Sequence, residues 1–286
     1  MPGAVSAQVD RLRQSDFRRL AAFIQNYSGI KMPPSKITML EGRLRQRVRD
    51  TGTADFVGYC RMLFEQDGLR AEAVHLIDAV TTNKTDFFRE PEHFRILVRQ
   101  ALPTLLENSH ANERAQVKLW SAACSTGAEP YTLAMVLSDF REHRPRLQFS
   151  ILATDLSTEV LAAACRGIYQ ESMAAAVPPE FRPRYLLRSR DRSRHLVRVV
   201  QELRARVMFG RLNLMDAEYP VDPDFDVIFC RNVLIYFDKP TQRAVLLRLC
   251  RHLRPGGYLF LGHSESLAGV DLPLRSVANT VLRRPP

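Results

Sequence analysis

The stretch 117–134, VKLWSAACSTGAEPYTLA, decides the fold that we predict for this chain. Its first half is an apolar run typical of a buried strand, and its second half places apolar side chains at helical spacing. Small residues and one glycine, Gly127, connect the two halves. A strand that turns directly into a helix is typical of an open α/β sheet, in which a ligand can approach the strand's carboxyl end and the free N–H groups of the helix.

Two roles are open for Glu129 on this stretch alone. Thr126 and Glu129 have the spacing of a capping box, in which both side chains satisfy backbone N–H groups at the helix start. The same glutamate is equally well placed to bind a ligand. Other parts of the chain are needed to decide between these roles.

Strands and helices alternate after this stretch, as a parallel sheet with crossover helices requires. Polar residues follow three of the predicted strands: Asp155 after 149–153, Asn213 after 207–210 and Asn232 after 226–230. Because parallel strands end at one edge of a sheet, we expect these side chains to gather there with Glu129. Asp155 could instead cap the next helix, although Ser157 could also do so. Residues 276–282 are predicted to form one last antiparallel strand.

The first 80 residues are predicted to form only helices, as a separate domain before residues 81–286. In the first helix Ser15 is the expected cap, an apolar stripe follows, and Gly29 is placed to end it. Ser35 is expected to open the second helix, which carries four basic residues, Arg43, Arg45, Arg47 and Arg49. These arginines lie on both flanks of the apolar stripe, so a solvated surface explains them as well as a binding face does.

Residues 168–201 interrupt the alternation and are predicted to form a small inserted antiparallel β-subdomain. The string HLVRVVQELRARVMFG, at residues 195–210, is expected to give two strands joined by a short turn, with the second strand passing into the main sheet. Nine arginines and two acidic residues lie between residues 182 and 206, so much of the net charge of +10 is local. Such a basic chain is expected to have an acidic partner.

Composition excludes several classes of protein. With 286 residues and 45% hydrophobic content, the chain can bury a large core. Neither a membrane-length apolar run nor a signal peptide is present, which predicts a cytoplasmic protein that is not inserted in a membrane. The five cysteines are odd in number and form no CxxC pair, so we expect reduced thiols and no bound metal.

Six strings occur in order along the chain: TTNKTDFFRE, WSAACSTGAEPY, ATDLSTEVL, RLNL, FCRNVLIYF and RPGGYLFLGHSE. They resemble those of the chemotaxis receptor methyltransferases, the CheR family, and the resemblance covers nearly the whole chain. It implies an enzyme that uses S-adenosylmethionine to methylate glutamate side chains of chemoreceptors, with S-adenosylhomocysteine as product. It also implies an all-helical N-terminal domain and a doubly wound methyltransferase sheet with an inserted β-subdomain. One departure is Ala128, where the family often has glutamate.

The resemblance also implies site residues. Arg89 and Tyr236 are the candidate catalytic residues, and Arg43, Arg45, Arg47 and Arg49 are candidates for contacting the acidic methylation helices of the receptor. Some family members bind a receptor C-terminal peptide through the β-subdomain; here a general electrostatic role is an equal alternative. A monomer is expected. The implied cofactor-binding residues are Asn83, Thr85, Arg89, Glu129, Asp155, Asn213, Leu214, Arg231 and Asn232.

The chemistry of this reaction agrees with the scarcity of acid–base motifs. A glutamate with a pKa of about 4.3 is ionised at neutral pH, so methyl transfer to it needs orientation and exclusion of water rather than a general base. Two alternatives are a nucleic-acid methyltransferase and a non-enzymatic cofactor sensor. The CRNV string at residues 230–233 argues against the first, because amino-methylating enzymes for nucleic acids usually carry an NPPY-like motif there.

Overall fold

The computed structural model describes residues 10–107, 116–265 and 270–286. The chain divides into two compact units between Thr82 and Asn83. None of the helices in the described ranges combines the length and apolar character that a membrane span requires.

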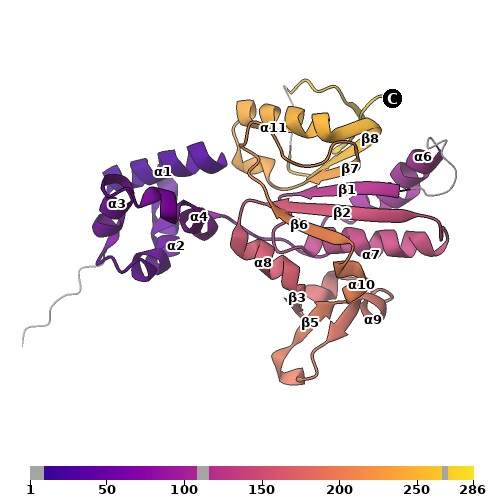
Figure 1. Ribbon diagram of the computed structural model, residues 1–286, viewed down its shortest axis with the longest axis horizontal. Coiled ribbons are helices and arrows are strands. Elements are labelled where there is room, and N and C mark those ends of the chain that lie inside the picture. Colours follow the sequence, from indigo (N-terminus) through magenta and orange to yellow (C-terminus); the bar gives the residue numbers. More distant parts are fainter. Residues whose placement is uncertain (1–9, 108–115, 266–269) are drawn as a thin grey trace, which may run out of the picture. The chain divides into compact units, whose positions relative to one another are not determined.

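From residue 10 onward, where the structure describes it, the N-terminal unit contains helices and no strand (Figure 1). Gly29 ends the first helix in the left-handed conformation, with φ of 74°, as predicted. The predicted helix starts were wrong: Ser15 lies inside the first turn, and Ser35 lies in a 3-10 turn before the second helix. The elements are α1 Gln14–Ser28, η1 Pro34–Lys36, α2 Ile37–Asp50, α3 Phe56–Glu65 and α4 Leu69–Val80.

The second unit contains a seven-stranded sheet of order β6-β2-β1-β7-β8-β10-β9. The first five strands in this order are parallel, and the chain moves outward from β1 in both directions. The order therefore reverses between β1 and β7, the place where doubly wound sheets bind ligands. The strands are β1 Gln116–Ala122, β2 Gln148–Asp155, β6 Val207–Arg211, β7 Phe225–Cys230, β8 Leu253–Leu261, β9 Arg275–Ala278 and β10 Val281–Arg283.

Helices cover both faces of this sheet (Figure 1). Alternate residues of β1 contribute to different cores: Leu119 to the core beneath α7, and Trp120 to the core beneath α11. The predicted doubly wound fold is confirmed. The helical elements are α5 Glu92–Ile96, η2 Leu97–Ala101, α6 Leu102–Glu107, α7 Ala128–Glu142, α8 Thr158–Arg166, η5 Leu234–Tyr236 and α11 Lys239–His252.

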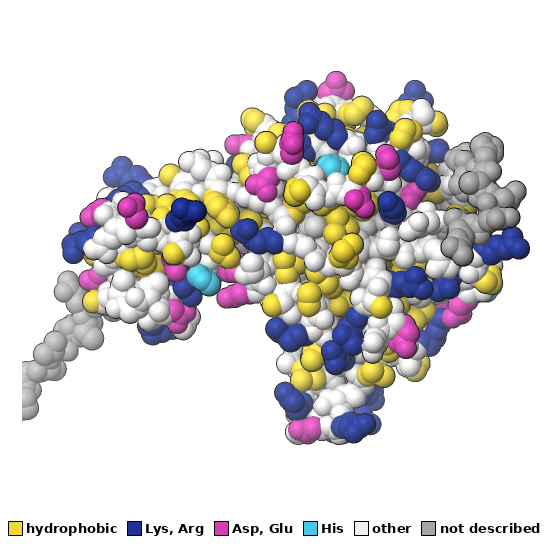
Figure 2. All heavy atoms as spheres, viewed as in Figure 1, with side chains coloured by type: hydrophobic (Ala, Val, Ile, Leu, Met, Phe, Trp, Pro, Cys, Tyr) yellow, Lys and Arg dark blue, Asp and Glu magenta, His cyan; other side chains and the backbone are white. Residues whose placement is uncertain are grey.

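The inserted subdomain forms a separate antiparallel sheet of order β3-β5-β4. The string HLVRVVQELRARVMFG holds two strands, and the second belongs to the main sheet as predicted: β5 pairs within the insertion, and β6 pairs with β2. A short helix, α10, separates them. Figure 2 shows basic side chains gathered around the insertion. Its elements are β3 Ile168–Gln170, η3 Met173–Ala176, α9 Arg182–Tyr185, β4 Leu186–Arg188, η4 Arg192–Arg194, β5 Leu196–Val199 and α10 Gln201–Arg204.

The predicted single strand at residues 276–282 is instead a hairpin. β9 and β10 pair antiparallel on either side of Thr280, whose φ is 56°. A positive φ does not continue an extended strand, so the chain reverses there.

Candidate functional site

The turn between β1 and α7 has an unusual backbone. Ala123, Ser125 and Gly127 have φ of 62°, 52° and 89°. A Cβ atom added to Gly127 would lie 2.9 Å from the Cβ of Ala164, so both the conformation and the close contact with α8 require glycine. Strained backbone of this kind is concentrated at functional sites.

The capping-box interpretation of this turn was wrong. Gly127 precedes the helix, and no side chain caps it. The carboxylate of Glu129 turns back to the sheet, where it accepts hydrogen bonds from Ser121 Oγ at 2.7 Å and Arg231 Nη1 at 3.1 Å. Burial raises the pKa of Glu129, while Arg231 and Ser121 oppose the rise by holding the charged form.

Arg231, directly after β7, connects the segments that meet at this edge. Its side chain is only 2% exposed, and its guanidinium bridges two carboxylates, Glu129 and Glu90. The Arg231 Nη2 atom lies 2.9 Å from Glu90 Oε2 and also donates to the backbone carbonyl of Arg89. Asn232, whose φ is 60°, donates from Nδ2 to Glu90 Oε1 at 3.1 Å.

Glu90 is a site residue that the sequence-based prediction missed. It ends the TTNKTDFFRE string, and its backbone is left-handed with φ of 57°. Burial alone would raise the pKa of Glu90, but hydrogen bonds from Asn232 and Arg231 outweigh burial and lower it to about 2. The carboxylate is therefore ionised at any physiological pH.

This low pKa predicts how stability depends on pH. Since the pKa of Glu90 is lower in the folded state than its ordinary value of 4.5, its stabilising contribution is complete above about pH 4.5 and is lost as the pH falls toward 2. Urea unfolding of wild type and Glu90→Gln between pH 3 and 7 tests this. The wild type should lose more stability on acidification than the variant. Parallel curves would contradict the assignment.

Asp155, at the end of β2, organises the other side of the turn. Its carboxylate accepts hydrogen bonds from the backbone N–H groups of Ser125 at 2.8 Å and Ser157 at 3.0 Å. The residue that caps α8 is Ser157 rather than Asp155, since the Ser157 Oγ atom accepts a hydrogen bond from Val160 N at 3.4 Å. Ser125 Oγ in turn donates to the carbonyl of Asn83 at 2.9 Å, which ties the TTNKT segment to the turn.

The remaining predicted cofactor contacts lie at neighbouring strand ends and in the 81–90 segment. Asn213 and Leu214 follow β6, where Asn213 Oδ1 accepts from Met215 N at 3.0 Å and Leu214 is buried. Thr85 is half-buried. Arg89 is half-buried and donates from Nη1 to the carbonyl of Lys84 at 3.3 Å.

Tyr236 lies on η5 and is partly buried against the core beneath α11. The loop that carries it is held by Glu265, another residue missed from sequence. The Glu265 carboxylate accepts from the backbone N–H groups of Val233 at 2.9 Å, Leu234 at 2.8 Å and Gly262 at 2.5 Å. A buried carboxylate that binds three N–H groups fixes the backbone on which Tyr236 depends.

The four arginines of α2 do not act alike. Arg43 donates to the carbonyls of Val80 and Thr81 and so ties α2 to the end of α4. Arg47 forms a two-pronged ion pair with Glu72, from Nε at 2.7 Å and Nη2 at 2.9 Å. By contrast, Arg45 and Arg49 are exposed.

Replacing Arg47 by alanine should therefore destabilise the helical unit. Glu72, whose side chain is 8% exposed, would keep a buried charge, and the hydroxyl of Tyr59 at 3.1 Å would be its one remaining partner among the residues that the structure describes. We expect the free energy of unfolding to fall by about 3 kcal/mol, measured by urea denaturation. The matched control is Arg45→Ala, which should cost less than about 0.5 kcal/mol. Equal losses in the two variants would contradict this structural role.

A group of potential metal ligands lies beside Arg231. Glu90, His93 and His263 each offer one atom, and these atoms lie within 4.8 Å of one another. The Glu90 carboxylate is already bound by Arg231 and Asn232. Burial, followed by the nearby Arg231, lowers the pKa of His93 to about 4, so its imidazole is neutral at pH 7.

The edge of the sheet can hold a ligand that is both cationic and hydroxylated. Glu90 and Glu129 outnumber the one guanidinium between them, so the cluster has one excess negative charge when both are ionised. Asp155 adds a third carboxylate to this edge. An ammonium or sulfonium group and a pair of ribose hydroxyls are the groups that such acceptors bind.

Comparison with known proteins agrees with this geometry. Residues 15–81 match the all-alpha domain of the CheR methyltransferases, and residues 83–282 match their SAM binding domain. A chemotaxis protein methyltransferase of Klebsiella aerogenes is 42% identical over 94% of this chain and 89% of its own length. Its counterpart in Escherichia coli is 40% identical over 92% and 88%. One from Borreliella burgdorferi is 37% identical over 90% of both chains.

Proposed function

This chain belongs to the CheR methyltransferase family, so it is an S-adenosylmethionine-dependent enzyme that methylates glutamates of chemoreceptors, and we propose that the residues around Arg231 and Asp155 hold the cofactor for that reaction. The observation that carries the proposal is the bridge from Arg231 to Glu90 and Glu129 at the point where the strand order reverses. The bridge joins the turn after β1, the loop after β7 and the 81–90 segment. These three segments form the walls of the proposed site.

The ends of β2 and β6 also contribute residues to the proposed site. Asp155 accepts the ribose hydroxyls, and Asn213 and Leu214 lie against the adenine. Glu129 and Asn232 face the methionine end, with Asn83, Thr85 and Arg89 contributed by the linker. When bound, the cofactor supplies an activated methyl group. Tyr236 and Arg89 then orient the receptor carboxylate and keep water from it.

The identity of the product tests this activity. Purified protein is incubated with receptor-containing membranes and S-adenosylmethionine labelled in the methyl group. A glutamate ester should release the label as methanol on mild alkali treatment. Alkali-stable label, or label on nucleic acid, would contradict glutamate methylation, and cofactor binding without labelled receptor would indicate a non-enzymatic sensor.

We propose that residues 1–80 recognise the receptor and that residues 81–286 catalyse the reaction, in the cytoplasm and as a monomer. Within the helical unit, Arg45 and Arg49 carry the recognition of acidic methylation helices. Arg45 lies over the ring of Phe56 and Arg49 donates to Gln46, but both side chains are exposed and can reach a partner. Arg43 and Arg47 are instead engaged with backbone carbonyls and with Glu72.

Replacing both Arg45 and Arg49 by glutamine should thus lower receptor methylation about tenfold at low ionic strength, because electrostatic attraction of the acidic receptor is lost. The difference should shrink as salt is added. Initial rates on receptor membranes measure the effect, and calorimetry with S-adenosylhomocysteine is the control, which should be unchanged. Unaltered methylation at low salt would remove these two arginines from the interface.

The inserted subdomain is a further candidate contact with the receptor. It carries a pocket of about 490 Å³ whose lining includes Pro179, Leu186 and Val197, with Arg182 and Arg188 among them. Arg188 is paired at 3.2 Å with Glu171, which also lines the pocket. The apolar residues suit the side chains of a receptor C-terminal peptide, and Arg182 suits its terminal carboxylate. Deleting that peptide from a receptor should weaken binding if the pocket has this role.

A further inference from the structure

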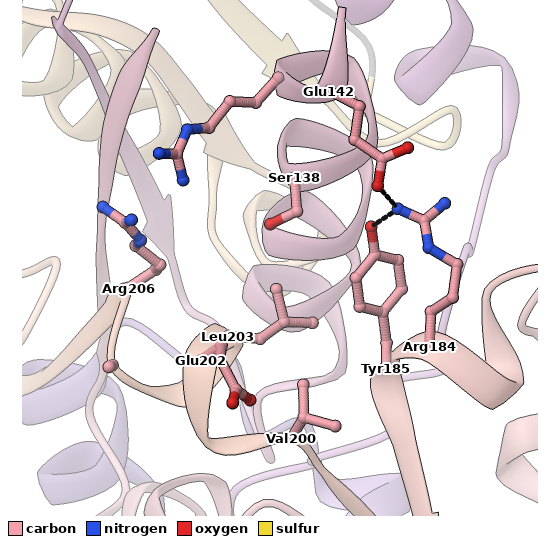
Figure 3. A pocket seen from close by; sticks show the side chains of 10 residues that line it. Ser138, Glu142, Arg184, Tyr185, Val200, Glu202, Leu203 and Arg206 are labelled. Carbon is pink, nitrogen blue, oxygen red and sulfur yellow. Dashed lines mark hydrogen bonds and ion pairs between the residues drawn. The ribbon is translucent and has the colours of Figure 1, made fainter. Parts of the chain in front are cut away.

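A second pocket lies at the opposite end of α7 from the proposed cofactor site. Its volume is about 740 Å³, within the range of small-molecule sites. Glu129 belongs to the first turn of α7. The residues of α7 that line this pocket belong to the last turns of the helix: Ser138, Arg141 and Glu142. Figure 3 shows the pocket between α7 and the residues that precede β6.

The arginines that line the pocket differ in whether they form ion pairs. Arg184 binds Glu142, lies 2.8 Å from Asp139 and donates to the hydroxyl of Tyr185, so its charge is fully compensated and one negative charge is in excess on the Arg184 side. Within the described parts of the chain, neither Arg141 nor Arg206 forms an ion pair. Two guanidinium groups in one pocket are thus available to an anion.

Nearby groups leave these two guanidiniums accessible. Arg206 lies over the ring of Phe149, 5.4 Å from its centroid, an arrangement that fixes the side chain and leaves its N–H groups free. Glu202 also lines the pocket, but Figure 3 shows its carboxylate directed away from Arg206. The excess of positive charge is therefore on the Arg206 side.

The rest of the lining is largely apolar. Val200 and Leu203 face the pocket from the segment around α10, and the ring of Tyr185 forms part of the opposite side (Figure 3). A pocket of this size exceeds the volume of an inorganic ion, and its apolar residues would remain in water if it bound only an ion. An organic body attached to the anionic group would cover them.

We propose that this pocket binds a small organic anion, whose phosphate or carboxylate group lies between Arg141 and Arg206 and whose apolar part packs on Tyr185, Val200 and Leu203. Guanidinium groups bind both kinds of anion with paired hydrogen bonds. The site is separate from the cofactor site, because α7 runs between them, and both sites can be filled together. α7 also connects the pocket to the turn that carries Glu129.

The test uses the full chain saturated with S-adenosylhomocysteine, so that the cofactor site cannot take up the probes. Phenyl phosphate, phenylacetate and the uncharged 2-phenylethanol are titrated in turn by calorimetry. One or both anions should bind at least about tenfold more tightly than the alcohol. The comparison of phosphate with carboxylate identifies the preferred group.

The variant Arg141→Gln/Arg206→Gln should weaken anion binding by at least about tenfold. A matched control, Arg192→Gln/Arg194→Gln, removes the same charge from the exposed η4 turn and should leave binding unchanged. If the first variant does not fold, Arg141→Lys/Arg206→Lys keeps the charge but lacks the paired donors, and it should still bind more weakly than wild type. The proposal is overturned if no anion binds at millimolar concentration, if the alcohol binds equally well, or if control and pocket variants behave alike.

Discussion

Replacing Arg231 by methionine is expected to reduce methyl transfer by about 100-fold or more, because the guanidinium holds together the three segments that form the proposed cofactor site. The bridged carboxylates Glu90 and Glu129 have side chains only 13% and 14% exposed, so each would be left with a poorly compensated charge. Removal of one member of such a buried group typically costs about 3–5 kcal/mol of unfolding free energy. Initial methylation rates and urea unfolding measure the two effects.

The variant Arg231→Lys distinguishes the effect of the positive charge from that of the guanidinium hydrogen-bond geometry. Lysine keeps the positive charge, but an ammonium group cannot simultaneously reproduce contacts to Glu90, Glu129 and the carbonyl of Arg89. We therefore expect most of the stability to return and most of the activity to remain lost. If both variants retain wild-type affinity for S-adenosylhomocysteine and wild-type rates, the bridge does not organise the site.

Sequence pattern was sufficient to predict the parallel sheet, whereas the ligand-binding role of the carboxyl ends of its strands stays a prediction. The apolar run of β1, which is buried on both faces from Leu119 to Ala122, and the polar residues at the ends of β2 and β7 are local features of each strand, so a sequence pattern can reveal them. The role of Glu129 is different. The spacing of Thr126 and Glu129 is the same whether the Glu129 side chain caps the helix or points back to the sheet. The residue that decides between these two orientations, Arg231, lies 102 residues away.

The same reasoning explains Glu90 and the C-terminal hairpin. Glu90 follows two phenylalanines and an arginine with no periodic pattern, and its contacts to Arg231 and Asn232 span 141 and 142 residues. The break at Thr280 depends on one backbone angle in an otherwise strand-like run. Both features are fixed by tertiary contacts, and a sequence pattern within one segment carries no information about such contacts.

Replacing Asp155 by alanine is the second large effect that we expect. The substitution removes the acceptor for the N–H groups of Ser125 and Ser157 and, in the proposed complex, the acceptor for the ribose hydroxyls. Hydrogen bonds to a charged group are worth about 1.5–3 kcal/mol, so affinity for S-adenosylhomocysteine should fall by roughly 10- to 100-fold in calorimetry.

Because Asp155 also shapes the turn, a loss of affinity needs a control for structure. Ser157→Ala removes the cap of α8 next to Asp155 and should cost about 1 kcal/mol of stability with little change in affinity. Asp155→Asn keeps one oxygen acceptor for the turn but loses the charge, so we expect an intermediate affinity. A direct ribose contact requires that Asp155→Ala lose far more affinity than Ser157→Ala at comparable stability. Unchanged affinity in Asp155→Ala would exclude Asp155 from the cofactor site and leave it a purely structural link between the turn and α8.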